Sequence, residues 1–523
     1  MSASGKPDAH HRLASHRVGR RGRPQFMNTM TTRGTPVFTH ESSAGRRRLG
    51  RRALAALSAV ALTAALAACG DDDDSSDDDS SAATDAPAES DAGAEDTEAA
   101  EDTDASDGEA AEDTEAADDS DAGGEASGDL GQQIRDLTGF DAESEACGGE
   151  EIGVGAVLAL TGPGSFYGTT MSRGLDLAAE HIEAAGGPVF AIEYKDHKSG
   201  DAAAGQQAMT ELGEAGYVAK FASYVDDLGA MLPGTAEYEM FTLDGGGGTS
   251  TFGQAQPFFW GTRAITPNDP IPGVLQYLSE TQPDATTVGL VGWDVGEPSN
   301  QTIKDDILAK IADAGFEHNG LYELTPVGSQ DYSQVLPKIT SNEPDILFAS
   351  LYGQDIGSFI NQAQTAGIES TVIGFEFTPD GINASKGTYE EGYTFAYDFF
   401  DAANPTNPWG QLFVDEFEAA YGEAPDFYAA NYYEDLFGMW DVVRRVCANG
   451  EEITGPTLDA AFQADPTLIS VYGGDESGPG TKTLDPETHT VTERTMGVFT
   501  YQDGEVTPLA YFDLDAADFQ MAE

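Results

Sequence analysis

The sequence predicts an α/β protein with two doubly wound lobes, each a mostly parallel sheet flanked by helices. Two observations lead to this prediction. Short apolar runs typical of buried strands alternate with amphipathic stretches typical of helices, first from residue 151 and again from residue 286. The 394 residues from 130 to 523 are also too many for a single hydrophobic core. Because ligands of such sheets bind beyond the carboxyl ends of the strands, we expect one site in a cleft between the lobes.

The first series begins with the run Ile-Gly-Val-Gly-Ala-Val-Leu, whose small and branched apolar residues are typical of a buried strand. Apolar residues then recur at helical spacing, and the pair Gly186-Gly187 ends that helix. We expect strands at 152–158, 190–194 and 219–223, with helices at 174–185 and at about 201–215.

The second series repeats this alternation from the run Thr-Thr-Val-Gly-Leu-Val-Gly onward. We expect strands at 286–292, 320–324, 345–350 and 371–374, with helices at about 299–314, 331–341 and 355–366. A further helix with an aromatic stripe is expected at 427–447. Two successive series of this kind predict two parallel sheets.

The amino terminus has the pattern of an export signal. Five arginines between 46 and 52 precede an apolar run at 53–68, which at 16 residues is shorter than the ~20 that span a bilayer. The run ends at Leu-Ala-Ala-Cys-Gly, which resembles the bacterial lipoprotein box, so Cys69 is expected to carry lipid. An ordinary cleavage site with a chance cysteine is the alternative. We expect 1–69 to be the signal, with Met27 and Met30 as alternative starts.

Residues 70–129 contain 26 acidic and no basic side chains. Such a chain cannot bury enough apolar surface to offset its ordering entropy. We therefore expect 70–149 to be a disordered acidic tether followed by an N-terminal segment of the body.

The body carries 63 acidic against 14 basic side chains over 130–523, a balance of −49 within a total of −65. A surface of this charge repels phosphate backbones, so no nucleic-acid partner is expected. After Cys69, only Cys147 and Cys447 remain. In an oxidising compartment this even pair predicts a disulfide that joins the N-terminal segment to the 427–447 helix.

The residues that follow the predicted strands resemble the extracytoplasmic solute-binding proteins of the branched-chain amino acid, amide and urea importers. The resemblance covers about 150–512 and rests on the order and spacing of several short motifs. These are 161–168 (TGPGSFYG), 194–201 (YKDHKSGD), Arg263, 330–333 (QDYS), 344–345 (PD), 359–363 (FINQA), 485–489 (DPETH) and 501–504 (YQDG).

This resemblance implies the type I periplasmic binding protein fold, with lobes joined by three hinge crossings. It assigns 150–265 and about 395–468 to lobe 1, and 266–394 and about 469–523 to lobe 2. The crossings are expected near 264–270, near 386–396 and within 465–500. Ligand bound by one lobe then gains contacts from the other only when the lobes close.

The resemblance also implies an aromatic residue on each lobe over the ligand. Tyr167, in the Gly-Pro loop after the first strand, matches the one on lobe 1, and Tyr352 matches the one on lobe 2. Glu376 matches the carboxylate that receives the ammonium group of an amino-acid ligand, a task suited to charge-assisted hydrogen bonds. An aromatic packed within its own lobe and a solvated surface carboxylate are the respective alternatives.

Two loops match the places where the family holds the ligand's carboxylate. Ser223 and Tyr224 end the third strand, and a four-glycine loop with Gly247 precedes Thr249. Consecutive glycines expose N–H groups and allow close approach of a ligand. Two aspartates follow at 226–227, where many members have small hydroxylated residues, and they favour a neutral or cationic ligand.

The aromatic start of the 427–447 helix borders the cleft in the family, so Phe427 and Tyr428 are both ligand candidates, while the rest of the aromatic stripe is expected in the core. No catalytic motif or phosphate loop is present in the sequence. The four body histidines have no metal-ligand spacing and are expected on the surface; they are His181, His197, His318 and His489. We expect no enzyme activity, no cofactor and no metal.

The expected function is that of a substrate-binding lipoprotein on the outer face of the cell membrane. It would bind a small amino acid or amide-like solute and deliver it to an ABC permease and its ATPase. A ligand-sensing receptor built on the same clamp is the first alternative, and a surface-anchored enzyme is a remote one.

Overall fold

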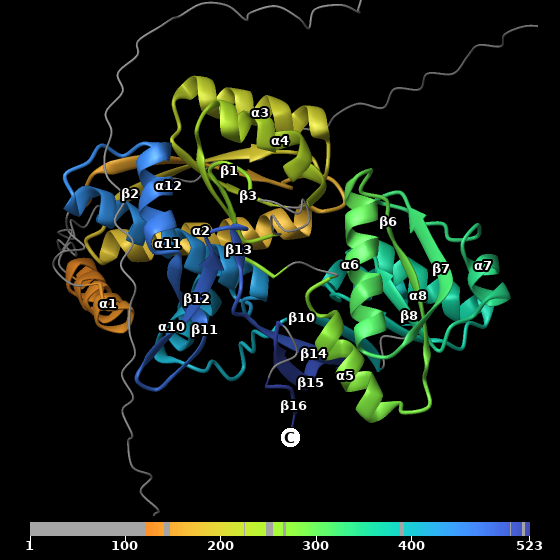
Figure 1. Cartoon of the computed structure of the whole chain (residues 1–523). Coiled ribbons are helices and arrows are strands. Elements are labelled where there is room, and N and C mark those ends of the chain that lie inside the picture. Colours follow the sequence, from red (N-terminus) through yellow and green to blue (C-terminus); the bar gives the residue numbers. More distant parts are fainter. Residues whose placement is uncertain are drawn as a thin grey trace, which may run out of the picture. The chain divides into compact units, whose positions relative to one another are not determined.

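The computed structural model describes residues 122–140, 147–223, 225–246, 255–264, 268–387, 392–502, 504–514 and 518–522 (Figure 1). The expected signal, with Cys69, and most of the expected tether lie outside these residues. The segment 70–149 is not a tether throughout, because helix α1 covers Ala122–Thr138. Arg135 of α1 donates to the carbonyl of Ala185 at 2.5 Å, and Ile134 is fully buried. This helix therefore packs on the body.

The first sheet has the strand order β11-β12-β13-β5-β4-β3-β1-β2. Its strands are β1 Glu151–Leu158, β2 Val189–Asp196, β3 Ala219–Ala222, β4 Phe241–Asp244, β5 Phe259–Gly261, β11 Thr467–Asp475, β12 Gly478–Asp485 and β13 Thr490–Val491. Strands β1 to β5 are parallel, while β11–β12–β13 form an antiparallel extension at one edge.

Helices cover both faces of this sheet (Figure 1). One face is packed by α3 and α4, and the other by α2 and α11. The helices of this lobe are α2 Ser165–Ala184, α3 Ala202–Ala215, α4 Val225–Glu237, α10 Pro408–Tyr421, α11 Phe427–Ala448 and α12 Gly455–Ala464. A Cβ on Gly174 of α2 would lie 2.3 Å from the carbonyl oxygen of Ala429, so glycine is what allows α2 to approach α11.

The second sheet repeats the arrangement with the order β16-β15-β14-β10-β9-β8-β6-β7. Its strands are β6 Thr287–Trp293, β7 Glu317–Thr325, β8 Ile346–Ser350, β9 Thr371–Gly374, β10 Tyr393–Asp398, β14 Thr495–Gln502, β15 Glu505–Asp513 and β16 Gln520–Met521. Its helices are α5 Ile271–Thr281, α6 Ser299–Asp313, α7 Leu336–Ser341, α8 Gln354–Ala366 and α9 Pro379–Ser385. The predicted pair of doubly wound lobes is confirmed.

Every strand and helix expected between 151 and 374 is present, and two helices differ at their start. Helix α2 begins at Ser165 and not at 174, so Tyr167 lies in its first turn and not in a loop. Helix α7 begins at Leu336 and not at 331, because Pro337 has no N–H and fits only the first turn of a helix.

The strand pairings revise the expected lobe boundaries. Strand β10 pairs with β9 and β14, so the second crossing follows Asp398 and does not lie near 386–396. The hairpin β11–β12 belongs to the first sheet, so lobe 1 extends beyond 468, and the third crossing lies between β13 and β14. No strand was expected at 467–485, and a strand pattern alone does not state which sheet edge a hairpin joins, because tertiary packing decides that.

A buried carboxylate, Asp398, connects residues at all three crossings. Its Oδ2 accepts from Arg263 Nε at 2.6 Å, just before the first crossing, and its Oδ1 accepts from Arg494 Nε at 3.1 Å, at the third. Burial alone would raise the pKa of Asp398, but the charges of the two arginines together hold it below the usual value. All three side chains are at most 2% exposed.

This ion cluster continues into the first lobe through Glu434 of α11. Arg494 Nη1 donates to Glu434 Oε1 at 3.0 Å, and Lys482 Nζ lies 2.8 Å from both Glu434 Oε1 and Asp435 Oδ1. Each buried charge in this group thus faces at least one opposite charge, which is the condition for burying ions without a large penalty.

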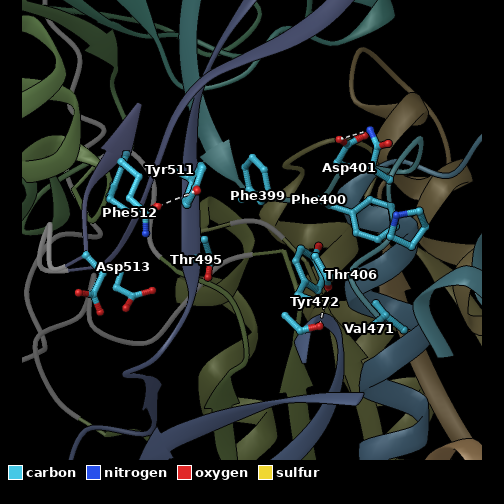
Figure 2. A pocket seen from close by; sticks show the side chains of 15 residues that line it. Phe399, Phe400, Asp401, Thr406, Val471, Tyr472, Thr495, Tyr511, Phe512 and Asp513 are labelled. Atoms are coloured by element: carbon cyan, nitrogen blue, oxygen red, sulfur yellow. Dashed lines mark hydrogen bonds between the residues drawn. The ribbon is translucent and has the colours of Figure 1, made fainter. Parts of the chain in front are cut away.

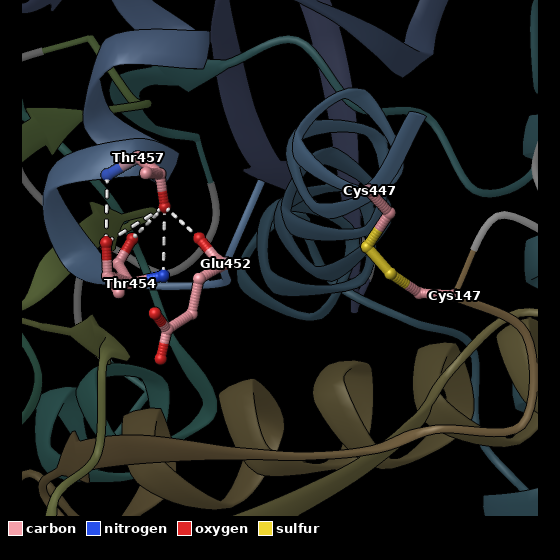
Figure 3. The surroundings of a disulfide bond; sticks show 5 residues. All are labelled: Cys147, Cys447, Glu452, Thr454 and Thr457. Carbon is pink, nitrogen blue, oxygen red and sulfur yellow. Dashed lines mark hydrogen bonds between the residues drawn. A yellow bond between two sulfur atoms is a disulfide. The ribbon is translucent and has the colours of Figure 1, made fainter. Parts of the chain in front are cut away.

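A disulfide joins Cys147, just before β1, to Cys447 near the end of α11 (Figure 3). Their Cα atoms are 6.0 Å apart and the bond spans 300 residues of sequence. Phe140 packs edge-on against Trp440 of the same helix, with ring centroids 4.7 Å apart. The N-terminal segment is therefore fixed to α11 by packing as well as by the covalent bond.

The expected surface position of the histidines is wrong for three of the four. His181, His197 and His489 are buried, and the exposed fraction of His197 is 0%. His181 Nδ1 lies 2.8 Å from the hydroxyl of Tyr433, and His197 Nε2 lies 3.2 Å from Ser223 Oγ. Burial lowers the pKa of His181 to about 4.

None of the helices in the described part of the chain has both the length and the apolar character that crossing a membrane requires.

The disulfide predicts a specific chemical result. In the unreduced protein, the peptides that contain Cys147 and Cys447 should remain joined, since a Cα separation of 6.0 Å suits a disulfide. Reduction should lower the free energy of unfolding by about 3–5 kcal/mol, because the bond closes a long loop. Peptide mass spectrometry after alkylation checks the linkage, and denaturant titration with and without reductant checks the energy. Alkylation of both thiols without prior reduction would contradict the bond.

A buried lysine predicts a pH dependence of stability. Lys220 of β3 is 0% exposed, and its Nζ has no hydrogen-bond partner among the described residues. Burial lowers its pKa to about 7, against a smaller opposing effect of Asp244. Between pH 7 and about 10.4 the unfolded chain therefore binds a proton that the folded chain does not.

The stability of the native protein relative to Lys220→Met should accordingly rise as the pH increases across that window. Urea titrations of both proteins at pH 7, 8, 9 and 10 measure this difference. Parallel curves for the two proteins would contradict the prediction, because they would show that Lys220 stays charged in the folded state across this pH range, as it does in the unfolded chain.

The two ion pairs of Asp398 predict that replacing this one carboxylate strongly lowers the stability of the protein. Asp398→Asn leaves two buried guanidinium groups without their common counter-charge, so it should lower the free energy of unfolding by about 3–5 kcal/mol. Glu323→Gln is the matched control, because Glu323 pairs with Lys338 at 2.6 Å on the surface, where the loss should stay below about 1 kcal/mol. Equal denaturation midpoints for the two variants would refute the role of Asp398.

Candidate ligand-binding site

The carboxyl ends of β3, β4 and β5 bring polar groups together in the first lobe. Ser223 follows β3 and is fully buried, and a Cβ on Gly246, after β4, would lie 3.2 Å from the Cα of Ser223. Arg263 follows β5 and donates from Nη1 to the carbonyl of Gly246 at 3.3 Å. Both lobes have the strand order 2-1-3-4-5, in which such strand ends border the ligand crevice.

Arg263 extends from the hinge into this region. Its Nη1 also donates to the hydroxyl of Tyr428 at 3.1 Å, and its Cζ lies 4.7 and 4.8 Å from the ring centroids of Phe427 and Tyr428. Two aromatic faces thus stabilise the guanidinium. Its Nη2 is buried and has no hydrogen-bond partner among the described residues.

Glu376 comes from the second lobe, two residues after the end of β9, and is 1% exposed. Its Oε2 accepts from the hydroxyl of Tyr428 at 2.9 Å, and its Oε1 accepts from the hydroxyl of Tyr167. Burial raises the pKa of Glu376, while the Tyr167 hydrogen bond and the charge of Arg263 oppose that rise. A carboxylate of the second lobe is therefore held by two hydroxyls of the first.

The backbone after β8 completes this contact. The N–H of Gly353 donates to Glu376, which also opposes the rise of its pKa. Gly353 has φ +54°, and a Cβ there would lie 3.6 Å from the hydroxyl of Tyr167. The neighbouring Tyr352 is half-buried, with its hydroxyl 3.2 Å from Ser350 Oγ and its ring 4.9 Å from that of Trp293.

A cavity of about 740 Å³ lies beside Glu376 and is lined by residues of both lobes. Phe427 and Tyr428 line it from α11, and Thr170 and Arg173 line it from α2. Its acidic lining residues are Glu376, Asp380, Glu423 and Asp426, with Glu423 paired to Arg173. The volume suits a small organic solute.

The structure brings three of the predicted ligand residues into direct proximity, namely Tyr167, Glu376 and Phe427. Ser223 joins them through Gly246 and Arg263, and Tyr352 adjoins them through Gly353. Tyr224, Gly247 and Thr249 lie outside the described residues, and nothing is described of the aspartate side chains at 226–227.

Sequence reasoning did not identify Arg263 as part of this group. It matched Arg263 only to a residue before the hinge, yet Arg263 contacts Tyr428, one of the two candidates at the helix start, which in turn contacts Glu376. The available signal was position, since Arg263 follows the end of β5 and Tyr428 lies in the first turn of α11, whose N-cap is Asp426. Among the described residues, no group of three or more His, Cys, Asp or Glu side chains is placed to hold a metal ion.

Comparison with solved structures shows the same fold. A leucine binding protein from Thermotoga maritima MSB8 matches with a TM-score of 0.60 at 17% identity, covering 69% of this chain and 98% of that chain. A branched-chain amino acid transporter substrate binding protein from Streptococcus pneumoniae, in complex with isoleucine, matches with 0.56 at 19%, covering 70% and 99%. A solute binding protein of an ABC transporter from R. palustris, in complex with benzoate, matches with 0.57 at 19%, covering 71% and 98%.

No curated protein matches the sequence. A family model does: the model described as periplasmic binding protein matches residues 151–505, which is more than half of the chain and includes both lobes. The chain belongs to the periplasmic binding protein family.

Proposed function

We propose that this protein is the substrate-binding component of an ABC importer, which captures a small amino acid or amide-like solute between its lobes. The main support is the contact at Glu376, where a buried carboxylate of one lobe meets Tyr167 and Tyr428 of the other. Ligand held at this point touches both lobes, so its binding energy favours the closed form.

The charges at this point suit a zwitterionic ligand. Glu376 is acidic, and Arg263 lies close enough to influence its pKa. An ammonium group is a strong partner for Glu376, because a charge-assisted hydrogen bond gains strength in a desolvated site. The similar structures are described as a leucine binding protein and as complexes with isoleucine or benzoate. Leucine, isoleucine and benzoate each carry a carboxylate group.

The proposed location of the protein at the membrane and its proposed partners are based on the pattern of the amino terminus and on the family. A lipid on Cys69 would hold the protein on the outer face of the cell membrane, since a two-chain anchor retains a protein stably. The acidic segment after Cys69 would act as the spacer between lipid and body. In its closed form the body would dock on a permease driven by a cytoplasmic ATPase.

The ligand class is tested by isothermal titration of the native protein with leucine, isoleucine, a short amide, urea and benzoate. At least one ligand with an ammonium group should bind with one site per chain. Glu376→Gln should weaken that ligand by about 2 kcal/mol or more, since it loses a charge-assisted bond, while any benzoate binding should change little.

Glu323→Gln serves as the control, because Glu323 pairs with Lys338 and does not line the cavity beside Glu376. Unchanged affinity of the ammonium ligand in Glu376→Gln would remove Glu376 from the site. Consumption of a ligand during the titration, with release of a product, would contradict a binding protein altogether.

A further inference from the structure

A histidine and a serine meet at the carboxyl edge of the first sheet. His197 directly follows β2, Ser223 directly follows β3, and both side chains are fully buried. The ring atom Nε2 of His197 lies 3.2 Å from Ser223 Oγ. Strand β1 lies between β2 and β3, so the two side chains meet at its carboxyl end. The pair is therefore on the edge where ligands of such sheets bind.

The turn after β2 determines which nitrogen of His197 carries the proton. The backbone N–H of Gly200 donates to Nδ1 at 3.3 Å, so Nδ1 is an acceptor and carries no proton. The imidazole then has its single proton on the other nitrogen, Nε2. The main chain of His197 is also fixed, because its N–H donates to the carbonyl of Leu158 at 3.0 Å. Nε2–H is thus held as a donor to Ser223.

This donor controls the hydroxyl group of Ser223. Because Ser223 Oγ accepts from His197, its own proton is left to be donated to another atom. Its acceptor in the described part of the chain is the carbonyl of Val157 at 3.5 Å, a distance at the limit of a hydrogen bond. The backbone after β4 stays close, since a Cβ on Gly246 would lie 3.2 Å from Ser223 Cβ. A carboxylate that reaches this point accepts the proton much more strongly than the carbonyl does.

The same two residue types form the nucleophile and the base of serine hydrolases, but the direction of donation here is the reverse. In a hydrolase, Nε2 accepts the serine proton, and Nδ1–H donates to a carboxylate. In this protein, Nδ1 accepts from Gly200 and Nε2 donates to Ser223. His197 in this tautomer does not accept the proton of Ser223. The arrangement therefore suits binding of an acceptor group and not nucleophilic attack.

We propose that His197 is a positioning residue, which directs the hydroxyl proton of Ser223 to the carboxylate of the ligand. The proposal rests on the proposed function, since it requires a solute that places its ammonium group at Glu376 and its carboxylate at the first lobe. A carboxylate accepts the directed proton in a charge-assisted hydrogen bond, whereas the hydroxyl of an amino alcohol gains only an ordinary one. His197 thereby favours a free amino acid over its alcohol.

The probes are leucine and leucinol, which share the ammonium group and the side chain and differ in the carboxylate. Calorimetry of the native protein should give an affinity for leucine at least about tenfold higher than for leucinol. His197→Phe keeps a ring without a donor, so it should weaken leucine by about tenfold and leucinol by no more than about twofold. His197→Gln donates from Nε2 at nearly the same place and should recover most of the loss. Equal losses for the two probes in His197→Phe would overturn the proposal.

A double-mutant cycle tests whether His197 acts through Ser223. In a Ser223→Ala background, His197→Phe should cause no further loss of leucine affinity, because the hydroxyl that it positions is absent. Additive losses would show that His197 acts independently of Ser223, and they would equally overturn the proposal.

Two matched controls remove similar groups elsewhere. His318→Phe replaces a half-buried histidine of β7, whose Nε2 lies 3.0 Å from the carbonyl of Leu321. Thr406→Val removes a hydroxyl at the wall of a separate cavity of about 500 Å³, where Oγ1 donates to the carbonyl of Gly473 at 2.5 Å (Figure 2). Both should leave the ratio of the two affinities unchanged. A fall of the ratio in either control, as large as in His197→Phe, would overturn the role of His197.

The position of the proton is measured without any ligand. Long-range proton–nitrogen NMR spectra of the native protein with labelled histidine, assigned by comparison with His197→Gln, should show the Nε2–H tautomer of His197. The Nδ1–H tautomer would overturn the proposal even if leucine binds. Absence of leucine binding would count against the proposed ligand class, and the tautomer would then decide the present proposal on its own.

Discussion

The arrangement of the two lobes depends on contacts between the three chain crossings, and one buried carboxylate links residues at all three. Asp398 sits at the end of β10 and accepts from Arg263 and Arg494, so each of its oxygens binds an arginine at another crossing. Two guanidinium groups at 2% exposure would be very costly without it. Such an arrangement fixes where the crossings lie relative to one another, while the lobes beyond them are held by other contacts.

The same arginine connects the hinge to the ligand-binding site. Arg263 binds Asp398 through Nε and reaches Tyr428 through Nη1, and Tyr428 in turn binds Glu376 of the second lobe. A change in the hinge that moves Arg263 must therefore disturb the hydroxyl that holds Glu376. The chain of contacts is short and fully buried, so movement at either end is transmitted through packed side chains with few alternative positions.

The sequence predicted what local patterns and strand ends determine. Alternating apolar runs located both sheets, and the family resemblance, together with position after a strand, selected Tyr167 and Glu376, which meet although 209 residues separate them. The ion cluster was not predicted, because Arg263 and Asp398 are 135 residues apart and no periodicity marks a pair of that kind. The expected lobe boundary at about 468 was wrong for a related reason, since the hairpin β11–β12, which was not predicted, joins the first sheet and its pairing is decided by packing.

The contacts already made by Glu376 restrict what a ligand must offer. Two tyrosine hydroxyls and a backbone N–H already donate hydrogen bonds to Glu376, so an additional uncharged donor would have to replace one of them. A neutral amide that replaced one hydroxyl would exchange one ordinary hydrogen bond for another and gain little. An ammonium group replaces it with a charge-assisted bond and also compensates a carboxylate whose burial raises its pKa. The most favourable ligand for this carboxylate is therefore a cationic group, provided that its remaining part fits among the rings of Phe427 and Tyr428.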